Sequence, residues 1–483
     1  MLFNSFEYLV FLPIVLILYY SIPKKNFRVI LLLVSSYIFY MCWNPVFILL
    51  ILTSTVLDYT ISKHLHRSES QTRRRRLLLL SIATNLGILF YFKYYNFLVE
   101  NLQIILETLS INATIPSHSW FLPVGISFYT FQTLSYTIDI YKRQNEPESN
   151  FLKFALYVSF FPQLVAGPIE RPQNLLPQFE VKQKFKYSNI SSGCKLILWG
   201  LFKKLVIADR LSLYVDQVYS NPDAYYGMPI ILATVFFVFQ VYCDFSGYTD
   251  MALGSARLMG YKLMDNFKGP LLSTSMTEFY RRWHISLSTW IRDYVYTPLG
   301  LYFREIPLTK RYILVFIITF VLFGFWHGAN WTFIVFGLFQ GIILSIETRF
   351  RKQRKYYSNN YKLFNLLGWI STIIFWTFSC LLFRSNNIND SFTLIASIFD
   401  YRDFNFWNIN IAPDKVGIVE LKISLFFCLI LIATHFIEYK TSIIEFLNKR
   451  SYITRHLVYF LLISSVIIFG EYGSYKQFIY FQF

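Results

Sequence analysis

Apolar segments recur along the whole chain and are separated by short polar stretches. A helix needs about 20 such residues to cross the ~30 Å hydrocarbon core of a bilayer. The candidate spans are residues 6–22, 27–43, 46–61, 77–98, 120–141, 151–166, 190–214, 228–251, 312–326, 331–346, 364–382, 421–436 and 456–470. Pro123 and Gly125 interrupt one of them and Gly167-Pro168 ends another, so one or both of these segments are expected to be re-entrant or tilted. The pattern predicts an all-α polytopic membrane protein with about eleven crossings plus such half-spans.

Composition supports this class and excludes two others. Of 483 residues, 55% are hydrophobic, 20% aromatic and only 15% charged, yet the formal net charge is +17. A nucleic-acid-binding protein of this charge would keep a polar surface on which Lys and Arg cluster. A soluble protein of this length would need more charged residues to cover its cores. The positive charge is therefore expected in the loops of a protein that has the lipid bilayer as its partner.

The loops alternate in charge, and this alternation predicts an orientation, because basic loops stay on the cytoplasmic side. The basic stretches of the predicted inner face are residues 24–28, 67–76, 142–143, 182–186, 203–204, 349–355 and 449–455. The loop 384–420, with Asp390, Asp400, Asp403 and Asp414, is predicted outside. The N-terminus and residues 471–483 are then extracytoplasmic, and the first segment, with no basic stretch before it, is expected to stay as an uncleaved helix.

His284 lies in residues 278–290, a segment too charged to cross lipid. As one helix, the segment and the turn after it would align an apolar stripe of Trp283, Leu287, Trp290 and Tyr294. Glu278 could pair with Arg281 or Arg282, while His284 and Ser288 would face polar space. Two interpretations remain open: an interfacial amphipathic helix with His284 on its polar face, or a functional site.

His327 ends an apolar run, between Trp326 and the small residues Gly328 and Ala329. With Gly324, these small residues would let a substrate or another backbone approach the imidazole. An imidazole can act as a general base near neutral pH. The structural alternative is a helix-end His, with Gly328 as the cap and Trp326 and Trp331 as interface anchors.

A third cluster contains Asp244, Ser246, Thr249 and Asp250 at the end of an apolar span. A carboxylate costs roughly 2.5 to 3.5 kcal/mol at the bilayer centre, so both aspartates need partners. Hydrogen bonds to Ser246, Thr249 or an Arg of a neighbouring helix would suffice. Structural support of a polar tunnel is the favoured interpretation.

Other site chemistries find no support in the sequence. The five cysteines are widely separated and include no Cys-x-x-Cys pair, so neither a disulfide framework nor a metal site is indicated. The phosphate-loop, dinucleotide-binding and serine-hydrolase motifs do not occur in the sequence.

At these clusters the sequence resembles the membrane-bound O-acyltransferase (MBOAT) family, and within it the bacterial alginate O-acetyltransferase-like branch. The motifs that carry the resemblance are LPVGISFYTFQ (122–132), FPQLVAGPI (161–169), DFSGYTD (244–250), RWHISLSTW (282–290) and FWHGANW (325–331). They follow the family's order and cover residues 120–341, the expected catalytic core of a single integral membrane domain, 1–483.

The resemblance implies a helical fold around a funnel or tunnel and transfer of an acyl group from a cytoplasmic thioester to a hydroxyl. His327 matches the family's near-invariant histidine, and His284 matches a second position where many eukaryotic members have Asn. Around them, Asp244, Ser246, Asp250, Glu278, Arg282, Trp283, Ser288, Trp326 and Asn330 are expected to line or support the site.

The acyl donor is expected to be acetyl-CoA as a co-substrate, with no tightly bound cofactor. Basic residues near the inner mouth would suit its phosphates, although the positive-inside rule also explains them. The candidates are Arg281, Arg282, Lys262 and Lys268.

The C-terminus, FIYFQF (478–483), resembles the aromatic tail motif of the bacterial branch. Its predicted outward position suggests that the tail folds back into the outer funnel and that the Tyr480 hydroxyl, activated by His327, takes the acyl group. The alternative is an aromatic tail lying in the headgroup belt.

We therefore expect a bacterial inner-membrane enzyme that carries an acyl group, with acetyl favoured, across the membrane to O-acetylate a secreted or cell-surface polysaccharide, as in alginate biosynthesis. An extracytoplasmic acetyltransferase is the expected partner. Within the family the alternative is a D-alanyl transferase for teichoic acid. From another class, the alternative is a transporter or channel, which would be expected to show inverted repeats.

Overall fold

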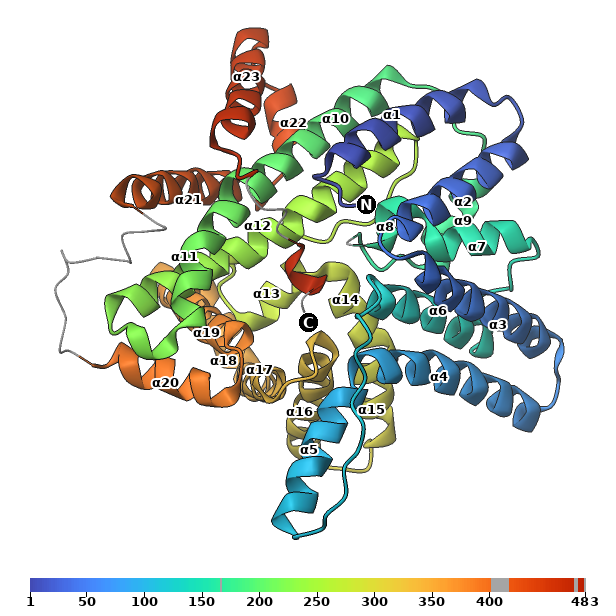
Figure 1. Cartoon of the computed structure of the whole chain (residues 1–483). Helices are drawn as coiled ribbons and strands as arrows, with labels where there is room; N and C mark the ends of the chain where they lie inside the picture. The colour runs from blue at the N-terminus through green and yellow to red at the C-terminus, as the bar shows by residue number, and fades with distance from the viewer. Residues whose placement is uncertain (166, 401–416, 473–476, 482–483) are drawn as a thin grey trace. The chain divides into compact units, whose positions relative to one another are not determined.

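The computed structural model describes residues 1–165, 167–400, 417–472 and 477–481, and every regular element among them is a helix (Figure 1). The predicted all-α class is confirmed. The chain forms two compact units, one of Met1–Ile197 and Met251–Met264, the other of Leu198–Asp250 and Asp265–Phe483. Asp403 and Asp414, which the charge pattern predicts outside, are not among the described residues.

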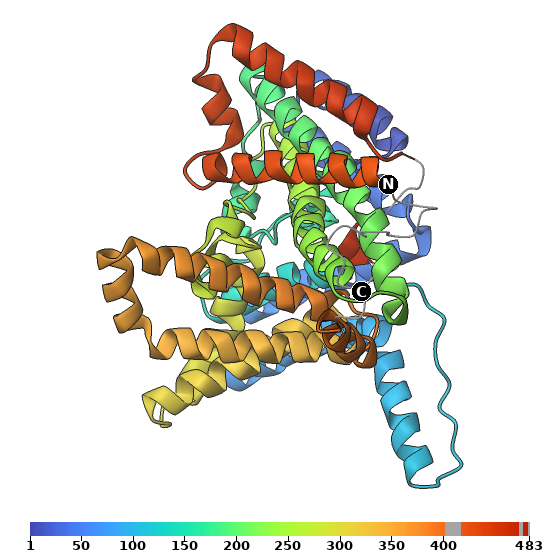
Figure 2. The ribbon, with the colours of Figure 1, turned by 90° about the vertical axis from the view of Figure 1, so that its left-hand side faces the viewer.

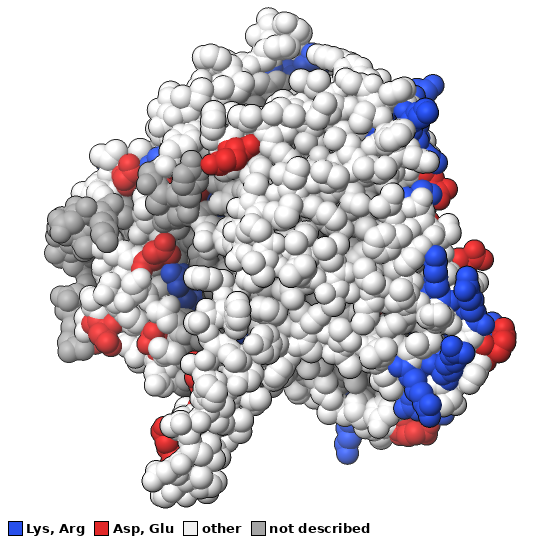
Figure 3. Space-filling model, turned by 45° about the vertical axis from the view of Figure 1, so that its right-hand side comes forward, with Lys and Arg blue, Asp and Glu red and all other residues white. Residues whose placement is uncertain are grey.

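Eight of the described helices are long and apolar enough to cross a membrane, by length and composition. They are Pro45–Arg67, Gln71–Lys93, Met228–Leu258, Leu308–His327, Trp331–Arg349, Lys362–Arg384, Ile418–Glu438 and Tyr452–Phe469. Two shorter apolar stretches are Phe6–Ser21 and Phe151–Leu164. Most of the surface in Figure 3 is uncharged, as a lipid-facing surface must be. The multi-pass class is confirmed, while the total of eleven crossings stays a prediction.

The first unit contains the elements that precede the site in the chain. Its helices are α1 (Phe6–Ser21), α2 (Lys25–Met41), α3 (Ile48–Arg67), α4 (Gln71–Lys93), α5 (Tyr95–Thr108), α6 (Ile126–Tyr141), α7 (Phe151–Ser159), α8 (Phe161–Leu164), α9 (Pro172–Glu180) and most of α10 (Tyr187–Leu201), with the short η1 (Pro45–Phe47). A buried polar cluster joins α3 to α4: Asp58 accepts hydrogen bonds from Ser81 Oγ at 2.5 Å and Asn85 Nδ2 at 2.9 Å. Such groups must find partners inside the protein, because lipid offers none.

Both segments predicted to be re-entrant or tilted are interrupted in the structure. In the first, helix α6 begins only at Ile126, after Gly125 with φ of 73°. A Cβ at Gly125 would lie 2.6 Å from the Leu164 carbonyl oxygen, so glycine is required for both the turn and the close approach. In the second, α7 ends at Ser159 and only the single turn α8 follows.

The second unit contains the candidate site. Its elements are η2 (Phe202–Ala208, a π-helix), α11 (Asp209–Ser220), η3 (Pro222–Ala224), most of α12 (Met228–Leu258), η4 (Pro270–Leu272), α13 (Met276–Arg282), α14 (Ile285–Ile291), η5 (Arg292–Tyr296, a π-helix), α15 (Thr297–Tyr302), α16 (Leu308–His327), α17 (Trp331–Arg349), α18 (Arg351–Asn360), α19 (Lys362–Arg384), α20 (Ile388–Ile398), α21 (Ile418–Glu438), α22 (Ile443–Asn448), α23 (Tyr452–Phe469) and η6 (Ile479–Phe481).

Helices α16 and α17 form a closely packed hairpin, seen as the yellow and gold helices side by side in Figure 2. A Cβ on Gly324 would lie 2.1 Å from the Phe333 carbonyl oxygen, and one on Gly337 would lie 2.1 Å from that of Phe320. The glycines therefore let the two backbones touch, and this contact fixes the end of α16, where His327 lies.

We expect Gly324→Ala to destabilise the protein by about 1 to 3 kcal/mol, because the added methyl group overpacks the hairpin. Thermal unfolding of the detergent-solubilised protein measures this effect. Gly87→Ala is the matched control in α4, where a Cβ would meet nothing within 4 Å, and it should be neutral or stabilising. Equal unfolding temperatures for the two variants would contradict the packing role of Gly324.

Candidate active site

His327 is the last residue of α16, and its side chain is buried. Its ring centroid lies 4.6 Å from that of Phe323, 5.3 Å from that of Phe383 and 5.6 Å from that of Tyr480. Gly328 beside it makes room for a side chain, since a Cβ there would lie 2.1 Å from the Phe333 ring. The sequence left open whether a substrate or another part of the protein comes close at these residues. The structure shows another part of the protein there.

The predicted continuous helix through His284 is wrong. Helix α13 ends at Arg282, Trp283 is extended, and His284 adopts the left-handed conformation, with φ of 43° and ψ of 55°, before α14 begins. Few residues other than glycine adopt this conformation, and such strain concentrates at functional sites. The predicted exposure is wrong too, since His284 is only 1% exposed and packs edge-on against Phe245 at 4.6 Å.

Asn266 determines which ring nitrogen of His284 carries the proton. Its Oδ1 accepts hydrogen bonds from the Ser286 amide at 3.2 Å and the Ser286 hydroxyl at 2.9 Å, so it is the acceptor. His284 Nδ1, 3.1 Å away, must then donate, which leaves Nε2 as the basic nitrogen. Burial lowers the pKa of His284 to about 3, so the ring is neutral at physiological pH.

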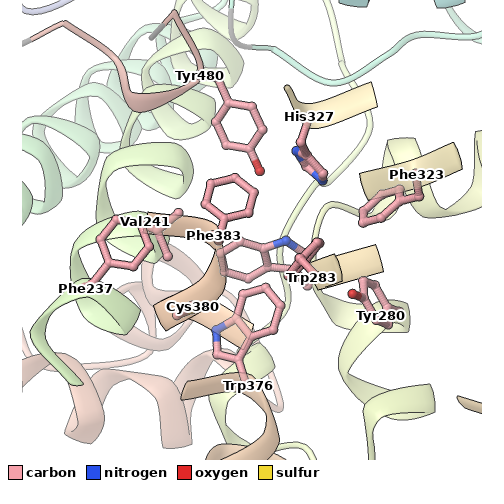
Figure 4. A pocket seen from close by; sticks show the side chains of 11 residues that line it. Phe237, Val241, Tyr280, Trp283, Phe323, His327, Trp376, Cys380, Phe383 and Tyr480 are labelled. Carbon is pink, nitrogen blue, oxygen red and sulfur yellow. The ribbon is translucent and has the colours of Figure 1, made fainter. Parts of the chain in front are cut away.

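Tyr480 lies near both histidines. Its ring centroid is 6.4 Å from that of His284, and its hydroxyl points into the pocket on the side of His327 (Figure 4). Burial raises the pKa of Tyr480 well above its usual value, so a free phenolate is costly. Proton loss from this hydroxyl therefore requires a base that acts during the reaction.

Aromatic and aliphatic side chains close the pocket around these groups. Its lining comprises Phe237, Val241, Tyr280, Trp283, Phe323, His327, Phe336, Trp376, Cys380, Phe383 and Tyr480. The free space is about 10 Å³, close to what one water molecule needs. Of the predicted supporting residues, only Trp283 lines this pocket. Sequence reasoning missed the wall from α19, Trp376 to Phe383, because those residues resemble any lipid-facing span.

Asp244 and Asp250 do need partners, but the partners are lysines. Lys204 Nζ lies 2.5 Å from Asp244 and 2.8 Å from Asp209. Lys203 Nζ lies 2.7 Å from Asp250 and donates to Ser246 at 2.9 Å. The prediction that Lys203 and Lys204 belong to an inner loop is wrong, since both are buried within η2.

A wider cavity of about 940 Å³ opens beside α13 and also reaches Tyr280 and Phe323 of the aromatic pocket. Seven basic side chains line it, against two acidic ones: Lys268, Arg281, Arg282, Arg292, Arg351, Arg354 and Lys355, with Glu278 and Glu347. The predicted pairing of Glu278 with Arg282 is confirmed, at 3.0 Å. Lys262 is not among the lining residues.

The remaining predicted residues have structural contacts. Ser288 lines the wide cavity and donates to the Trp283 carbonyl at 3.2 Å. Trp326 is buried, with its ring 5.0 Å from that of His327. Asn330 caps α17 through the Thr332 amide, and its Nδ2 donates to the Asn386 carbonyl at 2.7 Å. Asp250 and Asn330 line neither the aromatic pocket nor the wide cavity.

The chain matches the MBOAT, membrane-bound O-acyltransferase, family over residues 29–389. It is 38% identical to the probable alginate O-acetylase AlgI of Pseudomonas putida, over 85% of this chain and 83% of the relative. It is 33% identical to the peptidoglycan O-acetyltransferase of Helicobacter pylori, over 82% and 80%. The similarity to the teichoic acid D-alanyltransferase of Streptococcus thermophilus is lower, 28% over 48% and 58%.

The lowered pKa of His284 predicts an acid-sensitive fold. The unfolded chain binds a proton near pH 6.5 that the folded chain takes up only near pH 3, so stability falls as the pH drops below 6.5. At pH 5 this loss amounts to roughly 2 kcal/mol. His284→Asn, which does not titrate, should lose less stability between pH 7 and pH 5. Unfolding temperatures measure the difference, and identical pH profiles would contradict a buried neutral His284.

Proposed function

Because the chain belongs to the membrane-bound O-acyltransferase family and is therefore an acyl-transferring enzyme, we propose that it moves an acetyl group from acetyl-CoA, by way of Tyr480, to a polysaccharide outside the cell. The observation that carries this proposal is that Tyr480 and His327 line the same aromatic pocket, with their ring centroids 5.6 Å apart. Membership of an acyltransferase family argues against the alternative of a transporter or channel. The alginate and peptidoglycan relatives, which match most of the chain, favour a polysaccharide over teichoic acid.

In the first step, His327 takes the proton of the Tyr480 hydroxyl while the phenolic oxygen attacks the thioester carbonyl. A C–O bond forms, the C–S bond breaks, and the departing thiolate takes the proton from His327 to become free coenzyme A, which leaves the imidazole neutral again. A concerted base suits a phenol whose pKa burial has raised. In the second step an acceptor hydroxyl attacks the tyrosyl ester, the acyl group passes to that oxygen, and Tyr480 regains its proton.

The small free space in the pocket supports acetyl as the acyl group. About 10 Å³ is room for one small group, so an acetyl methyl that fills it leaves no space for water beside the thioester. His284, neutral and held by Asn266, contributes a fixed dipole beside Tyr480 rather than a charge.

The wide basic cavity is the proposed entry for the donor. Its excess of Arg and Lys suits the phosphates of coenzyme A, and it adjoins the aromatic pocket through Tyr280 and Phe323. By the positive-inside rule this mouth is cytoplasmic, and the tail is then on the other side of an inner-membrane protein, where an extracytoplasmic acetyltransferase would receive the acyl group.

We expect Tyr480→Phe to abolish acetylation of the C-terminal peptide, and His327→Ala to lower it about 10² to 10⁴-fold, because the general base is lost. Mass spectrometry of the purified full-length protein after incubation with isotope-labelled acetyl-CoA measures both. Tyr472→Phe is the matched control in the same part of the chain, since Tyr472 is 58% exposed and should not affect labelling. Full labelling of Tyr480→Phe on another residue would sink the carrier role.

Arg281→Gln should raise KM for acetyl-CoA about tenfold, the equivalent of about 1.4 kcal/mol, with little change in kcat. The residue is exposed and lines the wide cavity, so the change removes a phosphate contact without disturbing the core. Arg304→Gln, outside the cavity and paired with Glu305, is the control. Unchanged KM in both variants would argue for a carrier-protein thioester as the donor.

A further inference from the structure

The C-terminal segment that carries Tyr480 docks along one face of α12. Phe478 and Ile479 are buried, and the Phe478 ring lies 4.8 Å from Tyr248 and 5.4 Å from Phe245. The Tyr480 ring lies 4.6 Å from Phe245 and stacks on the Phe478 ring at 5.4 Å. In Figure 1 this segment is the short red helix beside α12 and α13. Aromatic contacts of this kind hold the segment against the helix, but they are less directional than a hydrogen bond.

One hydrogen bond sets the position of the segment along that face. The Ile479 amide donates to Asp244 Oδ2 at 2.7 Å, at a buried position. Ile479 directly precedes Tyr480, and Asp244 directly precedes Phe245, the residue on which Tyr480 packs. A main-chain bond to an ionised carboxylate is among the stronger hydrogen bonds of proteins, and here it fixes the backbone one residue away from the phenol.

The carboxylate is itself held in orientation. Asp244 Oδ1 binds Lys204 Nζ at 2.5 Å, which leaves Oδ2 directed at the tail. Lys204 is in turn shared with Asp209, at 2.8 Å, and all three side chains are at most 5% exposed. A buried charge without partners is expensive, so this arrangement constrains both the lysine and the carboxylate.

The backbone of η2 is irregular at the point where it builds this arrangement. The Asp209 amide bonds the Lys204 carbonyl, the five-residue spacing of a π-helix, which places both side chains on one face. Helix α12 comes close enough to complete the cluster because Gly247 carries no side chain: a Cβ there would lie 2.8 Å from the Gly200 carbonyl oxygen.

A third, polar cavity also borders the docked segment. It has a volume of about 130 Å³, and its walls include Asp216, Gln240 and Arg384 as well as the Lys204 cluster. Gln477 and Ile479 line this polar cavity, whereas Tyr480 lines the aromatic pocket. The segment therefore borders both spaces, with Tyr480 on the side of the aromatic pocket.

We propose that Asp244 is the positioning residue of the carrier: oriented by Lys204, it anchors the main chain at Ile479 and thereby holds the Tyr480 hydroxyl in the aromatic pocket for acyl loading. This inference rests on the proposed carrier role of Tyr480. It gives Asp244 a task that the aromatic contacts alone do not perform, which is to fix the register of the tail on α12.

Hydrogen–deuterium exchange of the full-length protein tests the anchor without reference to activity. In Asp244→Ala the C-terminal peptide that contains Ile479 should exchange at least about tenfold faster than in the wild type, because its amide loses a buried acceptor. Asp250→Asn is the matched control: it disturbs the other buried Lys–Asp pair of α12 and should leave tail exchange unchanged. Wild-type exchange in Asp244→Ala would overturn the proposal.

Acyl loading of Tyr480 is measured in parallel, by mass spectrometry with labelled acetyl-CoA. Asp244→Ala should lower the rate of labelling at least tenfold with KM for acetyl-CoA unchanged, as expected of a residue that positions the carrier and does not bind the donor. If the wild type acquires no label on Tyr480 while tail exchange responds as predicted, the carrier role fails and the anchor stands. If Asp244→Ala loads as the wild type does, the anchor fails and the carrier role stands.

Two variants on the tail keep the test decisive if Asp244→Ala does not fold. Ile479→Pro removes the amide donor and leaves the Asp244–Lys204 pair intact, at the first position of η6, where proline is tolerated. Ile479→Ala keeps the donor and removes most of the side chain. Loading that falls more in the proline variant than in the alanine variant supports the anchor, and equal loading in the two overturns it.

Discussion

Every polar group that the second unit buries must find its partner inside the protein, because the surrounding lipid offers no hydrogen bonds. The Lys204 ammonium meets this constraint for two carboxylates at once, those of Asp209 and Asp244. The other oxygen of Asp244 accepts the hydrogen bond of the Ile479 amide. The chain thus connects η2, α12 and the C-terminal segment through one charge cluster, and the docking of the proposed carrier depends on it.

The backbone is irregular at the two places that position His284 and the Lys204 cluster. A regular helix through His284 would point the imidazole away from Phe245, whereas the left-handed residue between α13 and α14 turns it inward. A regular helix through residues 202–208 would not place Lys204 and Asp209 on one face. Packing compensates for both departures: Asn266 accepts hydrogen bonds around His284, and Gly247 lets α12 cover η2. Strain that the surroundings maintain in this way is typical of functional sites.

The fold class could be predicted from the sequence because hydropathy over about 20 residues is a local property. His327 could be placed at a helix end for the same reason, since Gly328 and Asn330 mark the boundary locally. The burial of His284 could not, because residues 278–290 have a good amphipathic pattern and the break depends on distant contacts, from Asn266 and from the Lys268 amide to the Arg282 carbonyl. Lys203 and Lys204 were misassigned because two adjacent lysines look the same in a cytoplasmic loop and in a buried segment. Their partners Asp244 and Asp250 lie 40 and 47 residues further along the chain, beyond any local pattern.

The geometry also bears on why a carrier would be useful to this enzyme. A pocket with only about 10 Å³ of free space would shield a bound thioester from water, and it offers no room for a polymer. A side chain on a short terminal segment resolves this conflict, because it brings one hydroxyl into the closed pocket and needs only a small movement to leave it. An anchor made of one main-chain hydrogen bond and aromatic contacts suits that task. It is specific enough to fix the phenol beside His327, and it requires no covalent or metal bond to be broken when the tail departs.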